Sequence, residues 1–461
     1  MRKLMIFFLI ALFAIATGRA EENLDASLKE AAKNNPALKA KYTKYLASLQ
    51  KVPQVGSLPD PDLSFGYFIE PMEILGGKQR AQIQLMQMFP WWGTLKAAKN
   101  EATQMAKSDF ESFRAERDEL FFNVRKSYFQ LHLIDRQLAV NDSTLTLLKS
   151  IEQSLLAKMK IANQGVVVAS SSEATMSAGS AKKGGSMGSN SSGGEEKPSN
   201  ASMAGTPSMS TTGSALTDLL KLRVETASFE NSIVSMKKRR AVMAVQFNLL
   251  INRTAETPVT LPDKLLLPEI DYQCIALFDS IKQNNPMMGM SKADIAAYQS
   301  RQAMNRKMGY PMVGIGLNYT VVGKSEMSTS AMNGKDMVMP MLSVKLPIYR
   351  KKYTAAVKEA QLLESAASDN LNNTQNMLFM EFTDTQLAID EAERTLRLAT
   401  QNAELLRQSF ALQRVQYSTT GGGFDELLWT QKQLLDYRLD YLQAETDKQI
   451  AIARLQKLLS K

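Results

Sequence analysis

Two long stretches of the chain repeat apolar residues every seven positions between polar ones. In residues 350–418 the series is Phe382, Ile389, Leu396, Ala403, Phe410 and Tyr417. Residues 92–163 contain no Pro, and at about 1.5 Å rise per residue they predict about 108 Å of helix. Sustained heptads are typical of coiled-coil packing. Shorter helical runs follow at residues 216–252 and 424–459, so the pattern predicts two helical hairpins.

Four shorter stretches alternate apolar and polar or small residues with a period of two. They cover about residues 62–70, 80–89, 311–322 and 337–346. This period is typical of membrane β-strands, but half-buried hairpins of a soluble protein share it, and the pattern leaves both interpretations open. Pro340 cannot donate to a strand ladder, which predicts a bulge or a sheet edge there.

Four strands are too few for a closed membrane barrel, because the smallest barrels have about eight strands. If these strands span a membrane, several chains must therefore contribute to one barrel. A trimer would supply twelve strands, an even and closed number without free edges. On the membrane interpretation, which the pattern permits but does not establish, the expected fold class is mainly α with membrane β: a trimeric 12-stranded barrel on a cylinder of helical hairpins.

The same order of elements occurs twice. The motif at residues 33–36, Lys-Asn-Asn-Pro, returns as Gln-Asn-Asn-Pro at residues 283–286. We expect a first repeat over residues 21–252, a linker over 253–273 and a second repeat over 274–461.

The first repeat carries an insertion at residues 169–214. Its 46 positions hold 14 Ser and 8 Gly but no Leu, Ile, Val or aromatic residue. Such a segment cannot bury enough apolar surface to offset the entropy of ordering, so we expect a disordered loop.

The N-terminus has the pattern of a secretory signal peptide over residues 1–20. Arg2 and Lys3 precede an apolar stretch from Leu4 to Ala16, and small residues precede the expected cleavage site. The apolar stretch is shorter than the ~20 residues that a membrane helix needs. We therefore expect the mature chain to leave the cytoplasm.

Composition excludes several function classes. The chain has 55 basic and 46 acidic residues, an excess too mild for a nucleic-acid partner. His132 and Cys274 are the only residues of their types, so His-based triads, Cys/His zinc sites and intrachain disulfides are not possible. We expect no enzyme activity and no cofactor.

This layout resembles the TolC-like outer-membrane efflux factors over essentially all of residues 24–459. The two Asn-Asn-Pro motifs look like the usual opening of each family repeat. Residues 88–95, Met-Phe-Pro-Trp-Trp-Gly-Thr-Leu, are similar to the strand-to-helix junction of the branch that serves heavy-metal pumps, including copper and silver exporters. Gly165 with Asp218 looks like one hairpin tip.

Tyr417 with Gly421 and Asp425 looks like the other tip, with Gly422 and Gly423 completing its turn. The resemblance implies that acidic residues at the tips, here Asp218 and Asp425, form a constriction that favours cations. Tyr417 would help to hold the tip closed. The family often has a second acid one turn after the second-tip Asp, but Leu428 and Trp429 stand there.

The resemblance further implies a passive homotrimeric conduit in the outer membrane of a Gram-negative bacterium, extending into the periplasm. Its partners would be a periplasmic adaptor, an inner-membrane pump of the RND type and outer-membrane lipid. Heavy-metal cations such as copper or silver are the expected cargo. Alternatives are a conduit for multidrug efflux or type I secretion, and a soluble periplasmic coiled-coil scaffold.

Several candidate residues have plainer interpretations. Asp218 and Asp425 fit helix N-caps as well as a gate, and Tyr417 continues the heptad stripe. Trp91 and Trp92 fit membrane-interface aromatics at a strand end.

The insertion carries four methionines: Met176, Met187, Met203 and Met209. Their thioethers suit Cu(I) or Ag(I), which would make them metal ligands, but the segment is equally an inert linker.

Overall fold

The computed structural model describes residues 24–170, 210–262, 276–420 and 423–460. The expected signal peptide, Cys274, Gly421 and Gly422 lie outside the described residues. The four methionines of the insertion, Met176, Met187, Met203 and Met209, do so as well.

Long helices make up most of the described chain. Those of the first repeat are α2 (Leu24–Asn34), α3 (Pro36–Gly56), α4 (Thr94–Ser170) and α5 (Ser210–Leu250); those of the second are α6 (Ala276–Asn284), α7 (Pro286–Met308), α8 (Arg350–Thr420) and α9 (Phe424–Leu458). Among the described residues, no helix has the apolar run that would let it cross a bilayer.

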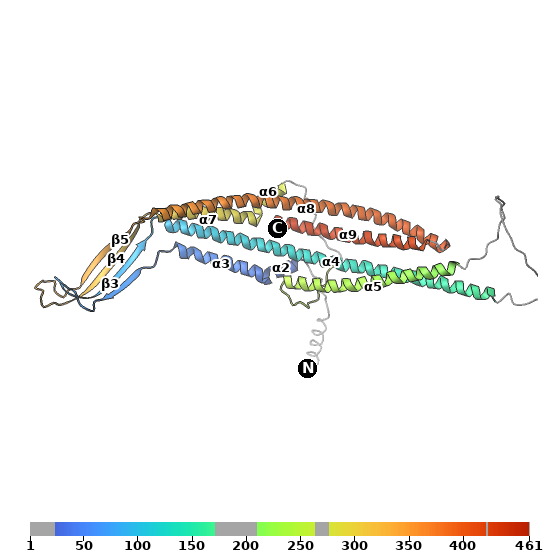
Figure 1. Ribbon diagram of the computed structural model, residues 1–461, viewed down its shortest axis with the longest axis horizontal. Helices are drawn as coiled ribbons and strands as arrows, with labels where there is room; N and C mark the ends of the chain where they lie inside the picture. The colour runs from blue at the N-terminus through green and yellow to red at the C-terminus, as the bar shows by residue number, and fades with distance from the viewer. Residues whose placement is uncertain (1–23, 171–209, 263–275, 421–422, 461) are drawn as a thin grey trace, which may run out of the picture. The chain divides into compact units, whose positions relative to one another are not determined.

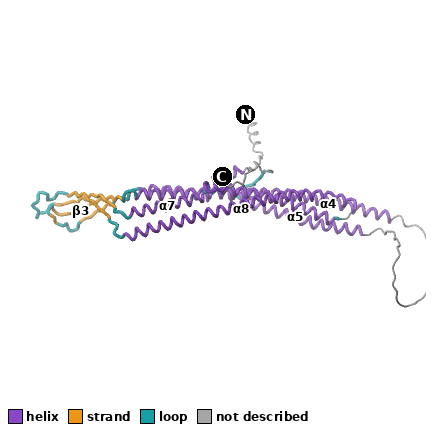
Figure 2. The backbone as a smooth tube through the Cα atoms, turned by 90° about the horizontal axis from the view of Figure 1, so that it is seen from above, coloured by secondary structure: helices purple, strands orange, loops and turns teal. Residues whose placement is uncertain are grey.

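The strands form one antiparallel sheet in the order β1-β3-β4-β5. Its members are β1 (Asp62–Tyr67), β3 (Gly77–Phe89), β4 (Met312–Gly323) and β5 (Met337–Lys345), and β3, β4 and β5 lie side by side in Figure 1. A two-residue strand that the sequence pattern does not predict, β2 (Glu73–Ile74), pairs with β3. Figure 2 shows the strands grouped together, with helices following them. Pro340 lies in β5, at a sheet edge.

The second Asn of the Asn-Asn-Pro motif makes equivalent hydrogen bonds in both repeats. In the first, Asn35 Oδ1 accepts hydrogen bonds from the N–H groups of Ala37 and Leu38, and its Nδ2 donates to Leu250 O at 3.0 Å. In the second, Asn285 Oδ1 accepts from Met287 N–H, and its Nδ2 donates to Leu458 O at 3.0 Å. Each Asn therefore caps one helix and joins it to the last turn of the hairpin's returning helix.

The chain divides into two compact units. One comprises residues 24–132, 243–394 and 445–460 of the described chain and contains the sheet. Its largest core surrounds Tyr128, Leu131, Phe247 and Ile251, each at most 1% exposed. Within this unit α7 packs on α8, where Asn305 Nδ2 donates to Ala356 O at 2.9 Å.

The second unit comprises the described parts of residues 133–242 and 395–444. It contains the C-terminal part of α4, most of α5, the C-terminal part of α8 and most of α9. Leu148, Leu155, Leu222, Phe424 and Leu427 form its core, and all are at most 3% exposed.

Two expected boundaries are wrong. Gly165 was expected to end the first long helix, but α4 continues through it to Ser170. A single Gly inside a helix costs only about 1 kcal/mol relative to Ala, which a long helix tolerates. The insertion was expected to extend to residue 214, but α5 already begins at Ser210. Ser and Thr are poor but permitted helix formers, so composition alone misplaces this start.

Asn285→Ala should lower the free energy of unfolding by about 1–2 kcal/mol, because it removes an N-cap and a buried hydrogen bond. Guanidinium unfolding of the full chain, followed by helical circular dichroism, measures the change. The matched control is Asn284→Ala, whose side chain is exposed, and it should shift stability by less than about 0.5 kcal/mol. Equal effects of the two substitutions would contradict the stabilising role of the Asn285 hydrogen bonds.

Candidate functional site

The tip of the second unit brings the candidate residues of both repeats together. Phe424 and Leu427, in the first turn of α9, pack against Leu148 of α4 and Leu222 of α5. Tyr417, near the end of α8, lies beside Phe424 with ring centroids 5.5 Å apart. This apolar cluster fixes the tip, so the charged residues around it are held in defined positions.

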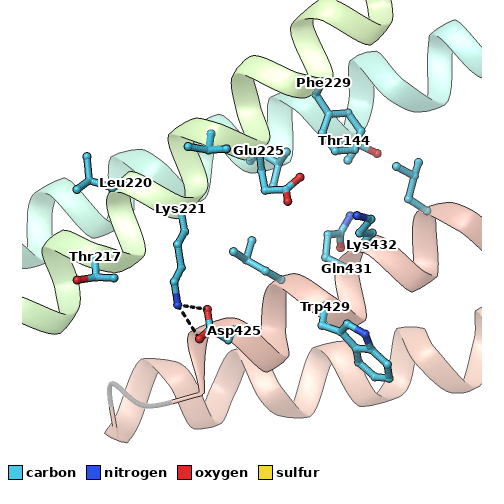
Figure 3. A pocket seen from close by; sticks show the side chains of 14 residues that line it. Thr144, Thr217, Leu220, Lys221, Glu225, Phe229, Asp425, Trp429, Gln431 and Lys432 are labelled. Carbon is cyan, nitrogen blue, oxygen red and sulfur yellow. Dashed lines mark hydrogen bonds and ion pairs between the residues drawn. The ribbon is translucent and has the colours of Figure 1, made fainter.

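Asp425 forms an ion pair with a residue that the sequence analysis missed. Lys221 Nζ of α5 donates to both carboxylate oxygens of Asp425, each at 2.7 Å, as the dashed lines in Figure 3 show. Both side chains are largely exposed, 46% for Lys221 and 71% for Asp425. An exposed pair contributes only about 0–1 kcal/mol, so it orients the tip more than it stabilises it.

Asp218 lies one turn before Lys221 on α5. This spacing of an acidic and a basic residue on one helix face is the signal by which the sequence could have identified the lysine. Partial burial raises the pKa of the Asp218 carboxyl, the negative charge of Asp425 raises it further, and Lys221 lowers it. Burial and the charge of Asp218 also raise the pKa of the Tyr417 phenol. Asp218 therefore lies within electrostatic reach of both Asp425 and Tyr417.

The N-cap interpretation is wrong for Asp218, because α5 begins eight residues earlier, at Ser210, and Asp218 lies in its interior. Asp425 is not an N-cap either, because α9 begins at Phe424. It lies in the first turn of α9 with Glu426, where a carboxylate interacts favourably with the helix dipole. Before it, Gly423 has φ +86°, the left-handed conformation that glycine adopts without strain. Gly423 thus belongs to the turn between α8 and α9.

A pocket of about 580 Å³ opens beside this ion pair, between α5 and α9 (Figure 3). Leu220, Val224 and Leu428 give it an apolar lining, and Trp429 at its rim is 60% exposed. Gln431 is 5% exposed, and its Oε1 has no hydrogen-bond partner among the described residues. The pocket therefore combines apolar surface with an unused buried acceptor.

A second group of candidates lies where the sheet joins the helices. Trp91 stacks on Tyr310 with ring centroids 5.2 Å apart, and Trp92 is 93% exposed. A nearby pocket of about 860 Å³ is lined by Arg306, Arg350 and Lys358, among others, and by no carboxylate. The sequence analysis missed Tyr310 and these basic residues, because they come from separate segments that only the fold brings together.

The register of the sheet separates two chemically different faces. Residues directly opposite each other share a face, so Leu63, Leu85 and Leu317 lie on one face, and Phe65, Ile83 and Tyr319 lie beside them. The exposed large side chains of this apolar face are Leu63, Phe65, Tyr67, Ile83, Leu85, Phe89, Val313, Ile315, Leu317, Tyr319, Val338, Leu342 and Val344.

An exposed apolar surface of this extent marks contact with lipid or with another protein. The opposite face carries Gln, Ser, Asn, Thr, Gly and Met.

Metal ligands of the usual hard or borderline kind are not gathered anywhere in the described ranges. Within them, no group of three or more His, Cys, Asp or Glu side chains could hold a metal ion. His132, in α4, has a buried Nε2 with no hydrogen-bond partner among these residues.

Comparison with known proteins gives a family match for the second repeat. Residues 277–461 match the model of the outer membrane efflux protein family. No curated protein sequence matches the chain.

Solved structures resemble the chain over nearly its whole length. The outer membrane protein VceC from Vibrio cholerae has a TM-score of 0.69 at 13% identity, with 95% of this chain and 96% of that chain covered. CusC, a protein that forms a transmembrane channel, has a TM-score of 0.67 at 15% identity, with 95% and 92% covered. The MtrE outer membrane channel of Neisseria gonorrhoeae has a TM-score of 0.66 at 13% identity, with 95% and 88% covered.

Asp218→Asn should slow hydrogen exchange in the first turns of α9 at pH 7. A carboxyl whose pKa is raised binds its proton more readily in the folded tip, so folded stability falls as pH rises through that value. The uncharged amide of Asp218→Asn does not lose stability in this way. The difference in stability between the variant and wild type should vanish as pH falls towards 3.8, the ordinary pKa of an Asp carboxyl. Mass spectrometry of exchanged peptides at several pH values measures the difference.

Asp142→Asn is the control, because Asp142 is exposed on α4 within the same unit. Faster exchange in Asp218→Asn than in wild type at pH 7 would contradict the predicted sign.

Proposed function

We propose that the chain is the outer-membrane channel of a tripartite efflux system. Residues 277–461 match the model of the outer membrane efflux protein family, and the fold is similar to that of solved outer-membrane channels, which supports the proposal. Three copies form a homotrimer whose sheets close into one barrel. The channel is a passive conduit and not an enzyme. It receives its cargo from a periplasmic adaptor and an inner-membrane pump of the RND type.

The exposed apolar face of the sheet carries this proposal. In water such a face would be unfavourable, whereas in a bilayer it contacts acyl chains. A lone sheet would leave β1 and β5 with unpaired backbone groups in lipid, each costing several kcal/mol. Pairing of β5 in one copy with β1 in the next removes both edges and turns the polar face towards the lumen.

The tip is proposed as the periplasmic gate. Asp218 and Asp425 contribute negative charge, and three copies bring six carboxylates to one ring, which favours cations. Lys221 neutralises part of this charge while the tip stays in the observed conformation. The pocket between α5 and α9 supports docking of the adaptor. Its apolar lining and the Gln431 oxygen, which has no partner in the described part of the chain, suit a helical partner.

Heavy-metal cations such as copper or silver are the proposed cargo. The support is chemical: the chain has 26 methionines, whose thioethers favour soft cations. The Trp91-Trp92 junction, which resembles that of the metal-exporting branch, adds to it. Conduits for organic toxins or for secreted proteins have the same architecture, so the cargo assay has to separate them.

Purified protein in planar bilayers should conduct ions as a trimer and prefer cations. The double variant Asp218→Asn with Asp425→Asn should lower the permeability ratio of cations to anions several-fold, because it removes the tip carboxylates. The control is Asp142→Asn with Asp436→Asn, the same change of charge at exposed positions away from the tip. A monomer that washes out of the envelope without detergent would instead support the soluble scaffold.

A strain lacking the gene should become sensitive to copper or silver salts, because the exported cation would accumulate. Growth inhibition by these salts, by detergents and by dyes measures the cargo class, with complementation by the wild-type chain as the control. Sensitivity to detergents or dyes alone would assign the channel to multidrug efflux.

A further inference from the structure

The polar face of the sheet contains an unusual number of methionines. The positions on the two strands beside β4 are Met86 and Met88 on β3 and Met337, Met339 and Met341 on β5, which we call the methionine face. Met312, the first residue of β4, lies on the same side. The register puts all five on the side opposite the apolar face, since Met86 and Met341 both pair with Gly316. Thioethers from two strands thus border one central strand, β4.

Small residues of β4 form the floor between these methionines. Gly314 and Gly316 face them, and Asn318 and Thr320 continue the same side of the strand. Asn318 is 4% exposed and Thr320 is 8% exposed, although the apolar residues on the other side of β4 are exposed. Neighbouring side chains therefore cover this side of the central strand.

Glycine contacts show where the β3 methionines lie. A Cβ atom on Gly314 would be 2.5 Å from Met88 Sδ, and one on Gly316 would be 3.3 Å from Met86 Cε. Both methionines thus occupy the space above glycines that any larger residue would fill. The β5 methionines lie on the same face beside β4, and two strand spacings, about 10 Å, separate the backbones of β3 and β5.

We propose that the methionine face is a thioether-lined binding track for a soft monovalent cation, Cu(I) or Ag(I). Thioether sulfur is a soft, neutral ligand that selects such cations over hard ones. Met has three rotatable bonds, so Met86 and Met341 can close on one ion above Gly316. Lys345 is the one charged residue that β5 places on this face, and Asp62 of β1 lies on it opposite Met86. Sulfur atoms are therefore the ligands at most positions, with one carboxylate beside Met86.

Weak binding fits the proposed channel. A conducting site must hold its ion well enough to admit it and loosely enough to release it, and neutral thioethers meet both conditions. The inference rests on the proposed function for the position of this face in the lumen. The binding chemistry itself can be tested without transport.

The test uses the full-length protein in detergent and chloride-free Ag(I) nitrate. All variants carry Cys274→Ser, so that a thiol does not compete. The face variant replaces Met86, Met88, Met337, Met339 and Met341 by Leu, which keeps volume and apolarity while removing sulfur. The control replaces five exposed methionines elsewhere by Leu, namely Met287, Met308, Met332, Met377 and Met380.

Equilibrium dialysis with elemental analysis counts bound silver, and X-ray absorption identifies its ligands. We expect the face variant to lose at least one Ag(I) per protomer and its sulfur-ligand signal, while the control keeps both. Unchanged silver binding in the face variant would overturn the inference. A smaller variant, Met339→Leu with Met341→Leu, gives the same comparison if the larger one does not fold.

Bilayer conductance and trimer assembly of the same samples separate the two proposals. A conducting trimer whose silver binding is equal in face and control variants defeats only the thioether track. A protein that never conducts defeats the proposed function, while loss of silver in the face variant alone would still support the thioether site.

Discussion

In the proposed channel, the backbone of the sheet has to satisfy all of its own hydrogen bonds, and the rest of the proposed architecture depends on this constraint. In lipid no water is present to pair with exposed N–H and C=O groups. The protomer presents a sheet with two open edges, β1 and β5, and with an apolar face turned outward. In the proposed channel, each edge strand pairs with the edge strand of a neighbouring copy, so that no backbone group is left unpaired. The helices must then continue the same symmetry, since α4 follows β3 and α8 follows β5 directly.

Periodicity predicts most of the secondary structure because burial imposes it. Heptads such as Phe382 and Ile389 exist to pack against neighbouring helices, and both side chains are buried. The outward alternation of Leu63 and Phe65 reflects a sheet with unlike faces. The pattern of apolar and polar residues does not predict contacts between segments that are far apart in the sequence. The pairing of Lys221 with Asp425 spans 204 residues, and Gly165 shows that a residue typical of turns is tolerated inside a helix that is long enough.

At the candidate gate, apolar packing and electrostatics have separate tasks. Phe424, Leu427 and Leu222 supply the stability, because they are almost fully removed from water. The Lys221–Asp425 pair beside them is exposed and adds little free energy, yet in the proposed channel the tip charges would determine the field that a passing ion meets. The sequence could suggest the two aspartates from their place near the hairpin ends. It could not reveal that a lysine neutralises one of them while the other is partly buried.

The hydrogen bonds of Asn35 and Asn285 bear on the order in which the chain folds. Asn35 can bond only after Leu250 has been synthesised, and Asn285 only after Leu458 has been synthesised. Each amide thus binds within its own repeat, so the first half of a nascent polypeptide can be completed and latched before the second half has been synthesised. In a duplicated chain, hydrogen bonds made within each repeat disfavour the exchange of equivalent hairpins between the two halves. Such an exchange is a characteristic misassembly of repeat proteins.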